Sequence, residues 1–178
     1  MKYKMAVIIA VASLLFSFAC SQSNKNPDIK GDVEKALSQV GLSNINVSQD
    51  RDKGVIRLSG DVQSDTDKQR AEAVVRSISN SYVIANEIGV RPSGTESDAK
   101  KVDSSLDTAI EKNFEALLVG NRLTKGINYS AKNGVLTLNG QVASLNQRHE
   151  VEKLAATVPN VKQVVNELQI KGVKATSK

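Results

Sequence analysis

Apolar and polar residues alternate in two stretches of the chain that read almost alike. VIRLSGDV at 55–62 and VLTLNGQV at 135–142 place apolar residues at every second position. This period belongs to a strand with one buried face, so each stretch predicts a half-buried strand. Residues 54–90 align with 134–170 without a gap, and ten of the thirty-seven positions are identical. The repeat indicates two tandem copies of one domain.

A shorter strand precedes each repeated stretch. INVSQ at 45–49 and INYSA at 127–131 show the same alternation. A glycine, Gly54 or Gly134, stands just before the following strand, where a tight hairpin needs the positive φ that glycine adopts without strain. Each copy therefore predicts an antiparallel β-hairpin.

A helical period lies on both sides of each hairpin. After Ser64 and Ser144 the apolar residues recur at i, i+3, i+4 and i+7, and each serine is a candidate N-cap. A similar apolar stripe opens each copy. The stripe positions are Ile29, Val33, Ala36, Leu37, Val40, Ala71, Val74, Val75 and Ile78 in the first copy, and Leu106, Ala109, Ile110, Phe114, Leu117, Val151, Leu154, Ala155 and Val158 in the second. A last apolar segment, YVIANEIGV or VKQVVNELQI, predicts a third strand.

The order helix, strand, strand, helix, strand implies a two-layer architecture. The predicted fold class is α+β, with two small tandem αββαβ domains, each a three-stranded mixed sheet with two helices on one face. We expect the domains at 28–91 and 104–171. A polar linker at 92–103, which contains Pro92 and Gly94, is expected to join them.

The second domain places apolar residues on the sheet face that the helices leave open. Val135 and Val165 point toward that face. Taken singly, each valine is a strand former on a solvated surface, and the face could also meet a protein partner. Taken together, the residues favour docking of the two domains through their open sheet faces.

Two glycines and two asparagines recur in both copies as structural positions. Gly60 and Gly140 fall on the inward side of a strand, where we expect the missing side chain to let a helix approach closely. Asn86 and Asn166 fall on the core side of the third strand, and a buried amide needs hydrogen-bond partners. One interpretation is a ligand contact, but recurrence in both copies favours an amide that ties the strand to a neighbouring loop.

The first residues have the pattern of an export signal. Two lysines precede an apolar run at 5–18, which predicts a signal peptide at 1–19. Cys20 follows at the cleavage point, and we expect it to carry a lipid anchor at the start of a polar tether, 20–27. The alternative is ordinary cleavage after Ala19, which would leave Cys20 as an unpaired thiol.

The second copy carries the clearest resemblance to a known family. NGVLTLNGQV, then a helix, then PNVKQVVNELQI resembles the BON domain, a module of the bacterial envelope. The resemblance covers nearly all of residues 28–171. It implies binding without chemistry, because members of this family are periplasmic or anchored to the outer membrane, several are associated with osmotic or envelope stress, and some associate with anionic phospholipid. The shared motif residues determine the fold, so the resemblance assigns no binding residue.

Composition leaves little for catalysis. The chain has one histidine and one cysteine, which gives no zinc-binding spacing, and we expect no metal, no cofactor and no enzymatic activity. His149 falls on the polar side of a helix, where we expect a surface role. Asp61, Asp65 and Asp67 suit a solvated turn and a helix start better than a general-acid pair.

The formal net charge is +5, and the second domain is the more basic, with eight basic and six acidic residues at 104–171. This bias favours an anionic surface but lacks the dense basic stripe and the stacking aromatics of a nucleic-acid binder. Leu118 and Val119 lie at a predicted helix end near Arg122 and Lys125, and we expect these four residues to contact an anionic membrane or a partner. The other interpretation is that Leu118 completes the packing of the helix and the cations are solvated.

The sequence therefore predicts a lipoprotein that faces the periplasm from the outer membrane. It would bind anionic phospholipid or an envelope protein and support membrane integrity or stress tolerance. Ser21 follows Cys20, as in lipoproteins that are sent on to an outer membrane, and a short tail is expected at 172–178. The alternative is a soluble periplasmic osmotic-stress protein with a chaperone-like or adaptor role, and acylation of Cys20 separates the two.

Overall fold

The computed structural model describes residues 26–172, which form two αββαβ units in tandem. The first contains α1 (Lys30–Gln39), β1 (Asn46–Asp50), β2 (Val55–Val62), α2 (Asp65–Ile78) and β3 (Val83–Val90). The second contains α3 (Glu96–Gly120), β4 (Ile127–Lys132), β5 (Val135–Val142), α4 (Leu145–Ala156) and β6 (Gln163–Ile170). The predicted signal peptide, the lipidation site Cys20 and residues 173–178 of the predicted tail lie outside the described residues.

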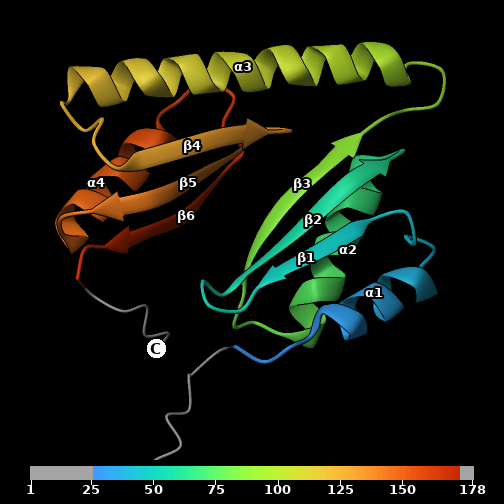
Figure 1. Ribbon diagram of the computed structural model, residues 1–178. Coiled ribbons are helices and arrows are strands. Elements are labelled where there is room, and N and C mark those ends of the chain that lie inside the picture. Colours follow the sequence, from blue (N-terminus) through green and yellow to red (C-terminus); the bar gives the residue numbers. More distant parts are fainter. Residues whose placement is uncertain (1–25, 173–178) are drawn as a thin grey trace, which may run out of the picture.

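Each domain has one three-stranded mixed sheet, and the two sheets share one topology. β2 pairs antiparallel with β1 and parallel with β3, and β5 pairs in the same way with β4 and β6. α1 and α2 cover one face of the first sheet, while α3 and α4 cover one face of the second (Figure 1). The predicted fold class is confirmed.

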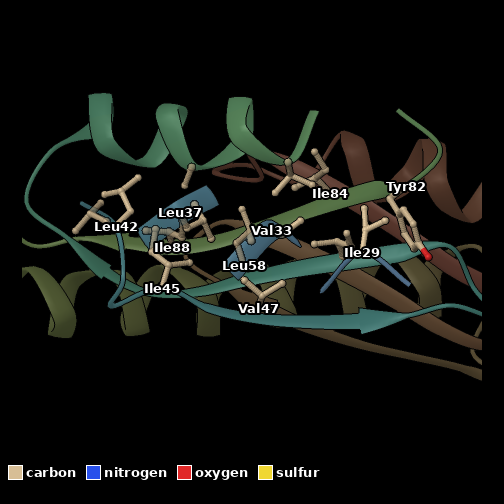
Figure 2. Packing of buried hydrophobic residues seen from close by; sticks show 14 residues of the cluster. Ile29, Val33, Leu37, Leu42, Ile45, Val47, Leu58, Tyr82, Ile84 and Ile88 are labelled. Carbon is tan, nitrogen blue, oxygen red and sulfur yellow. The ribbon is translucent and has the colours of Figure 1, made fainter. Parts of the chain in front are cut away.

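The apolar stripes of the sequence meet between the helices and the sheets. In the first domain Val33 and Leu37 of α1 pack with Leu58 and Ile88 of the sheet (Figure 2). In the second domain Phe114 of α3 is fully buried in the corresponding core. Burial of these side chains on one face of each sheet supplies the main driving force for folding.

The second helix of each domain begins at its predicted cap. The N–H of Asp67 donates to the Ser64 hydroxyl at 3.1 Å, and the N–H of Gln147 donates to the Ser144 hydroxyl at 3.2 Å. These bonds satisfy backbone donors that the first turn of a helix leaves free. Both N-cap predictions are confirmed.

Helix α3 is longer than the sequence predicted. It begins at Glu96, inside the expected linker, so that only residues 91–95 separate β3 from the helix. Carboxylates in its first turn, from Glu96 and Asp98, stabilise the positive end of the helix dipole. The apolar stripe starts only later in the helix, which is why the first turns read as linker. None of the helices within residues 26–172 is both long and apolar enough to cross a bilayer.

The recurring strand glycines have a different role from the one predicted. Gly60 and Gly140 have φ of 123° and 114°. A Cβ on Gly60 would lie 2.9 Å from the carbonyl oxygen of Asn44, and one on Gly140 would overlap the carbonyl oxygen of Gly126. The close neighbour is therefore the backbone that leads into the adjacent strand, not a helix, because the end of each hairpin strand twists onto that segment.

The two sheets face each other through the sides that carry no helices (Figure 1). Val55 and Ala85 of the first domain form a buried cluster with Val135 and Val165 of the second. The predicted docking of the open sheet faces is confirmed. The cluster has only four small side chains, so polar contacts around it contribute much of the remaining interface.

Candidate functional site

The end of α3 has the geometry of a helix that closes on a left-handed residue. Arg122 has φ of 57° and donates its backbone N–H to the carbonyl of Val119 at 3.1 Å. The N–H of Leu123 donates to the carbonyl of Leu118 at 2.9 Å. This pair of bonds is the Schellman motif, in which glycine usually takes the left-handed position.

The end of α1 has the same motif with the usual residue. Gly41 has φ of 79°, its N–H donates to Ser38 at 3.1 Å, and the N–H of Leu42 donates to Leu37 at 2.9 Å. Arg122 therefore stands at the position that glycine occupies in the first domain. An L-residue in this conformation costs about 1–2 kcal/mol relative to glycine, so the arginine is held there against a local preference.

Leu118 is not part of the surface. Its side chain is 2% exposed and lies in the core of the second domain, as its counterpart Leu37 does in the first. The prediction that Leu118 lacks a counterpart and contacts a membrane is wrong, because the helix ends match when the two Schellman motifs are superposed.

The other three residues of the predicted contact are on the surface. Val119 is 60% exposed, and Arg122 and Lys125 are exposed beside it in the chain. Within the described part of the chain, no acidic side chain forms an ion pair with Arg122 or Lys125. The end of α3 thus presents one apolar side chain and two cations to solvent.

The recurring asparagines link each third strand to a helix. The Asn86 amide donates to the Lys68 carbonyl at 3.2 Å and to the Glu72 carboxylate at 3.1 Å. In the second domain the Asn166 amide donates to the Glu152 carboxylate at 2.9 Å. These contacts fit the structural interpretation, although the tie is made to a helix and not to a loop.

The bond from Asn86 also affects the charge state of Glu72. Burial acts to raise the pKa of Glu72, but hydrogen bonds from Asn86 and Arg76, together with the charges of Arg76 and Lys68, outweigh it and the pKa is lowered. The carboxylate form is therefore the form that holds β3 against α2.

Comparison with known protein families agrees with the resemblance noted from the sequence. Residues 104–172 match the family model of the BON domain, and residues 26–78 match the YscD/CdsD-like Bon-like domain 2. An Anaplasma centrale protein, described as an uncharacterized protein in gshII 5'region, is 31% identical over 142 residues, which cover 78% of this chain and 90% of that protein. The chain belongs to the BON-domain family.

Two further comparisons concern characterised proteins. Osmotically-inducible protein Y of Escherichia coli strain K12 is 27% identical over 135 residues, which cover 73% of this BON-domain chain and 64% of that protein. The solved C-terminal domain of CdsD, a structural protein of the type III secretion system of Chlamydia trachomatis, is 12% identical with a TM-score of 0.33. That comparison covers 80% of this chain and 96% of the domain.

The remaining candidate residues of the BON domains lie apart from one another. His149 is exposed on α4. Asp65 and Asp67 are in the first turn of α2, whereas Asp61 lies at the end of β2 within 3.5 Å of Arg91. Among residues 26–172, no group of three His, Cys, Asp or Glu side chains has the arrangement of a metal site.

One feature between the two BON domains was missed at the sequence level. A polar cleft of about 440 Å³ lies between β2, α3 and the β4–β5 hairpin. Arg91, 8% exposed, lines this cleft and pairs with both Asp61 and Asp103. Arg91, Asp61 and Asp103 are too far apart in the sequence to form a recognisable motif, so only the folded chain shows that they lie together.

Proposed function

We propose that this BON-domain protein is a non-enzymatic component of the bacterial envelope that binds the surface of anionic phospholipid membranes through the end of α3. The observation that carries this proposal is Arg122, an exposed cation in a backbone position that suits glycine. Backbone strain of this kind persists where the side chain has a use that offsets it.

The neighbouring side chains suit a headgroup region. Val119 is apolar and exposed, and Arg122 and Lys125 follow it within six residues. A basic residue near an anionic membrane contributes about 1 kcal/mol of attraction, and an apolar side chain adds contact with the acyl boundary. The contact is therefore expected to be weak by itself and to depend on salt.

A lipid anchor would supply the rest of the membrane affinity. We propose that Cys20 is acylated and holds the protein at the outer membrane, facing the periplasm. A single surface patch gives only reversible binding, whereas an anchor together with a cationic patch gives stable attachment. The function proposed for this arrangement is to support outer-membrane integrity or tolerance of envelope stress.

Flotation with lipid vesicles tests the surface contact. Unacylated protein of residues 21–178 is mixed with neutral phosphatidylcholine vesicles or with vesicles that contain phosphatidylglycerol, at low and high salt. We expect binding to the anionic vesicles only, and weaker binding at high salt. Arg122→Asn together with Lys125→Gln should reduce partitioning about thirtyfold, because two basic contacts are lost. Asparagine is chosen because it tolerates the left-handed conformation.

The matched control removes the same charge from the other end of α3. Lys100→Gln together with Lys101→Gln lowers the net charge by two at exposed positions. This control should bind almost as the unmodified protein does. Equal loss in both double variants would mean that net charge alone drives binding. Absence of binding to anionic vesicles would reject the surface contact and favour an envelope protein as partner.

A second candidate function is that of a soluble periplasmic osmotic-stress protein with an adaptor or chaperone-like role. The similarity to osmotically-inducible protein Y favours it. The mass of the mature N-terminus separates the two functions, since an acylated Cys20 supports the anchored protein. Cleavage that leaves an unmodified thiol at Cys20 supports the soluble one.

A further inference from the structure

The interface between the two domains brings equivalent positions of the repeat together. The buried cluster consists of Val55 with its counterpart Val135, and Ala85 with its counterpart Val165. Each domain therefore uses the same patch, on the second and third strands of its sheet. An interface built from one patch on both partners is the isologous arrangement of two-fold dimers.

The polar contacts around the cluster follow the same approximate two-fold relation. Lys53 of the first domain donates to the Glu167 carboxylate at 2.7 Å. Its counterpart Asn133 donates to the carbonyl of Glu87, which is the counterpart of Glu167, also at 2.7 Å. The reciprocal pair of contacts shows that the relation extends beyond the apolar residues.

One position breaks the symmetry. Arg57 stands where the second domain has Thr137, and the two side chains meet with 3.3 Å between Nη1 and Oγ1. A residue that contacts its own counterpart lies close to the two-fold axis. The interface therefore has one guanidinium near its axis and no second cation at the equivalent position.

That single guanidinium serves both recurring glutamates. Arg57 pairs with Glu87 through Nη1 and with Glu167 through Nη2, the latter at 2.8 Å. The two glutamates are only 5% and 9% exposed. Buried carboxylates need charged partners, and Arg57 is the one that both share. Lys53 also pairs with Glu167 at 2.7 Å, and Lys132 pairs with Glu87 at 3.4 Å.

We propose that the open sheet face is a pairing surface between BON domains, and that Arg57 makes it select a partner domain with a small residue at the position of Thr137. In this chain the partner is the second domain. Two first domains face to face would bring Arg57 against its own copy near the axis. Two second domains would bury two copies of Glu167 without a guanidinium. The asymmetry thus favours pairing of a first domain with a second domain over pairing of two identical domains.

The symmetry gives a test in the full chain. Arg57→Thr removes the guanidinium and leaves both glutamates without it, so the sheets should separate more often. Hydrogen exchange at the backbone N–H of Asn86 reports this separation, because that N–H donates across the interface to the Gln163 side chain at 3.3 Å. We expect the exchange to become about ten- to hundredfold faster.

Adding Thr137→Arg to Arg57→Thr transfers the guanidinium to the equivalent position across the axis. We expect this double variant to restore slow exchange at Asn86 to within about threefold of the original protein. Arg57→Thr with Ser105→Arg is the matched control, because it has the same net charge and carries the new guanidinium on the exposed side of α3. It should remain as fast as Arg57→Thr alone.

Core amides at Val75 and Val151 serve as internal references, because exchange there reports whether each domain is still folded. With these references unchanged, slow exchange at Asn86 in Arg57→Thr would overturn the proposal. Failure of Thr137→Arg to restore protection would also overturn it, since a two-fold pairing surface must accept the guanidinium from either side.

Discussion

Arg91, at the end of the first domain, donates from Nη2 to the Oδ1 of Asn133 in the β4–β5 hairpin at 3.2 Å. The same guanidinium pairs with Asp103 of α3 and lies within 3.5 Å of Asp61. One buried side chain therefore joins the end of the first domain to α3 and to the β4–β5 hairpin of the second domain. This cluster adjoins the interface around Arg57, because the Asn133 side chain also donates to the carbonyl of Glu87.

Replacement of Arg91 by alanine should reduce the free energy of unfolding by about 1.5–3 kcal/mol, which is typical of hydrogen bonds to a charged group. The loss stays in this range because the side chain of Asp61 is 54% exposed and can be rehydrated. Urea denaturation followed by circular dichroism measures the change.

Arg70→Ala is the control for Arg91→Ala. Arg70 lies on the surface of α2 and is 3.7 Å from Asp67, with its side chain 50% exposed. Exposed pairs of this kind contribute less than about 0.5 kcal/mol. Similar losses in the two variants would mean that the buried cluster has no special role.

Replacement of glycine by alanine should have opposite effects on stability at a strand glycine and at a helix glycine. Gly140→Ala should destabilise the protein by more than about 2 kcal/mol, because φ is 114° and the new Cβ would overlap the carbonyl oxygen of Gly126. Gly31→Ala should stabilise it by about 0.5–1 kcal/mol, because Gly31 lies in α1 with open space around the new methyl group. Thermal unfolding of the two variants measures both effects, and equal stability would contradict the assignment of Gly140.

The sequence was sufficient for the parts of the fold that depend on local patterns. The strand period around Leu58 and Leu138, and the caps at Ser64 and Ser144, each depend on a few neighbouring residues. The outward valines suggested docking because, taken together, they form an apolar face that no helix of their own domain covers. The first turns of α3 were missed since they face solvent, with Val102 57% exposed, and so carry no apolar stripe.

The candidate site was predicted only in part, for a similar reason. Leu118 was assigned to the surface because the sequence alignment did not place it opposite Leu37. Superposition of the two Schellman motifs places Leu118 opposite Leu37 and Arg122 opposite Gly41. Gly41 was the one residue in the sequence that indicated where the two helix ends correspond. The contacts of Arg57 with Glu87 and Glu167 join strands from both domains, so no local pattern indicates them.

The tie between β3 and α2 predicts a pH-dependent effect of Asn86→Ala. Glu72 has a lowered pKa in the folded protein, so its contribution to stability is present above its unfolded pKa of about 4.3 and is lost as pH falls through the folded value. Loss of the Asn86 bond should therefore cost about 1 kcal/mol at pH 7 and less at pH 3. Urea denaturation at the two pH values measures the difference.

Glu72→Gln provides the comparison for that pH effect. Glutamine keeps an acceptor for the amide of Asn86 but cannot titrate, so the stability of this variant should change less with pH between 7 and 3. An Asn86→Ala effect of the same size at both pH values would show that the amide acts through packing and not through the charge of Glu72.

Arg122→Gly should raise stability and weaken membrane binding at the same time. Glycine adopts φ of 57° without the strain of an L-residue, which outweighs the greater freedom of glycine in the unfolded chain, and the expected gain is about 0.5–1 kcal/mol. Loss of the cation should weaken binding to anionic vesicles about fivefold. Arg122→Lys keeps both the charge and the strained backbone, so its stability and its binding should stay close to those of the original protein. A gain in stability without any loss of binding would show that Arg122 does not contact the membrane. Anionic vesicles would then have to bind another part of the molecule.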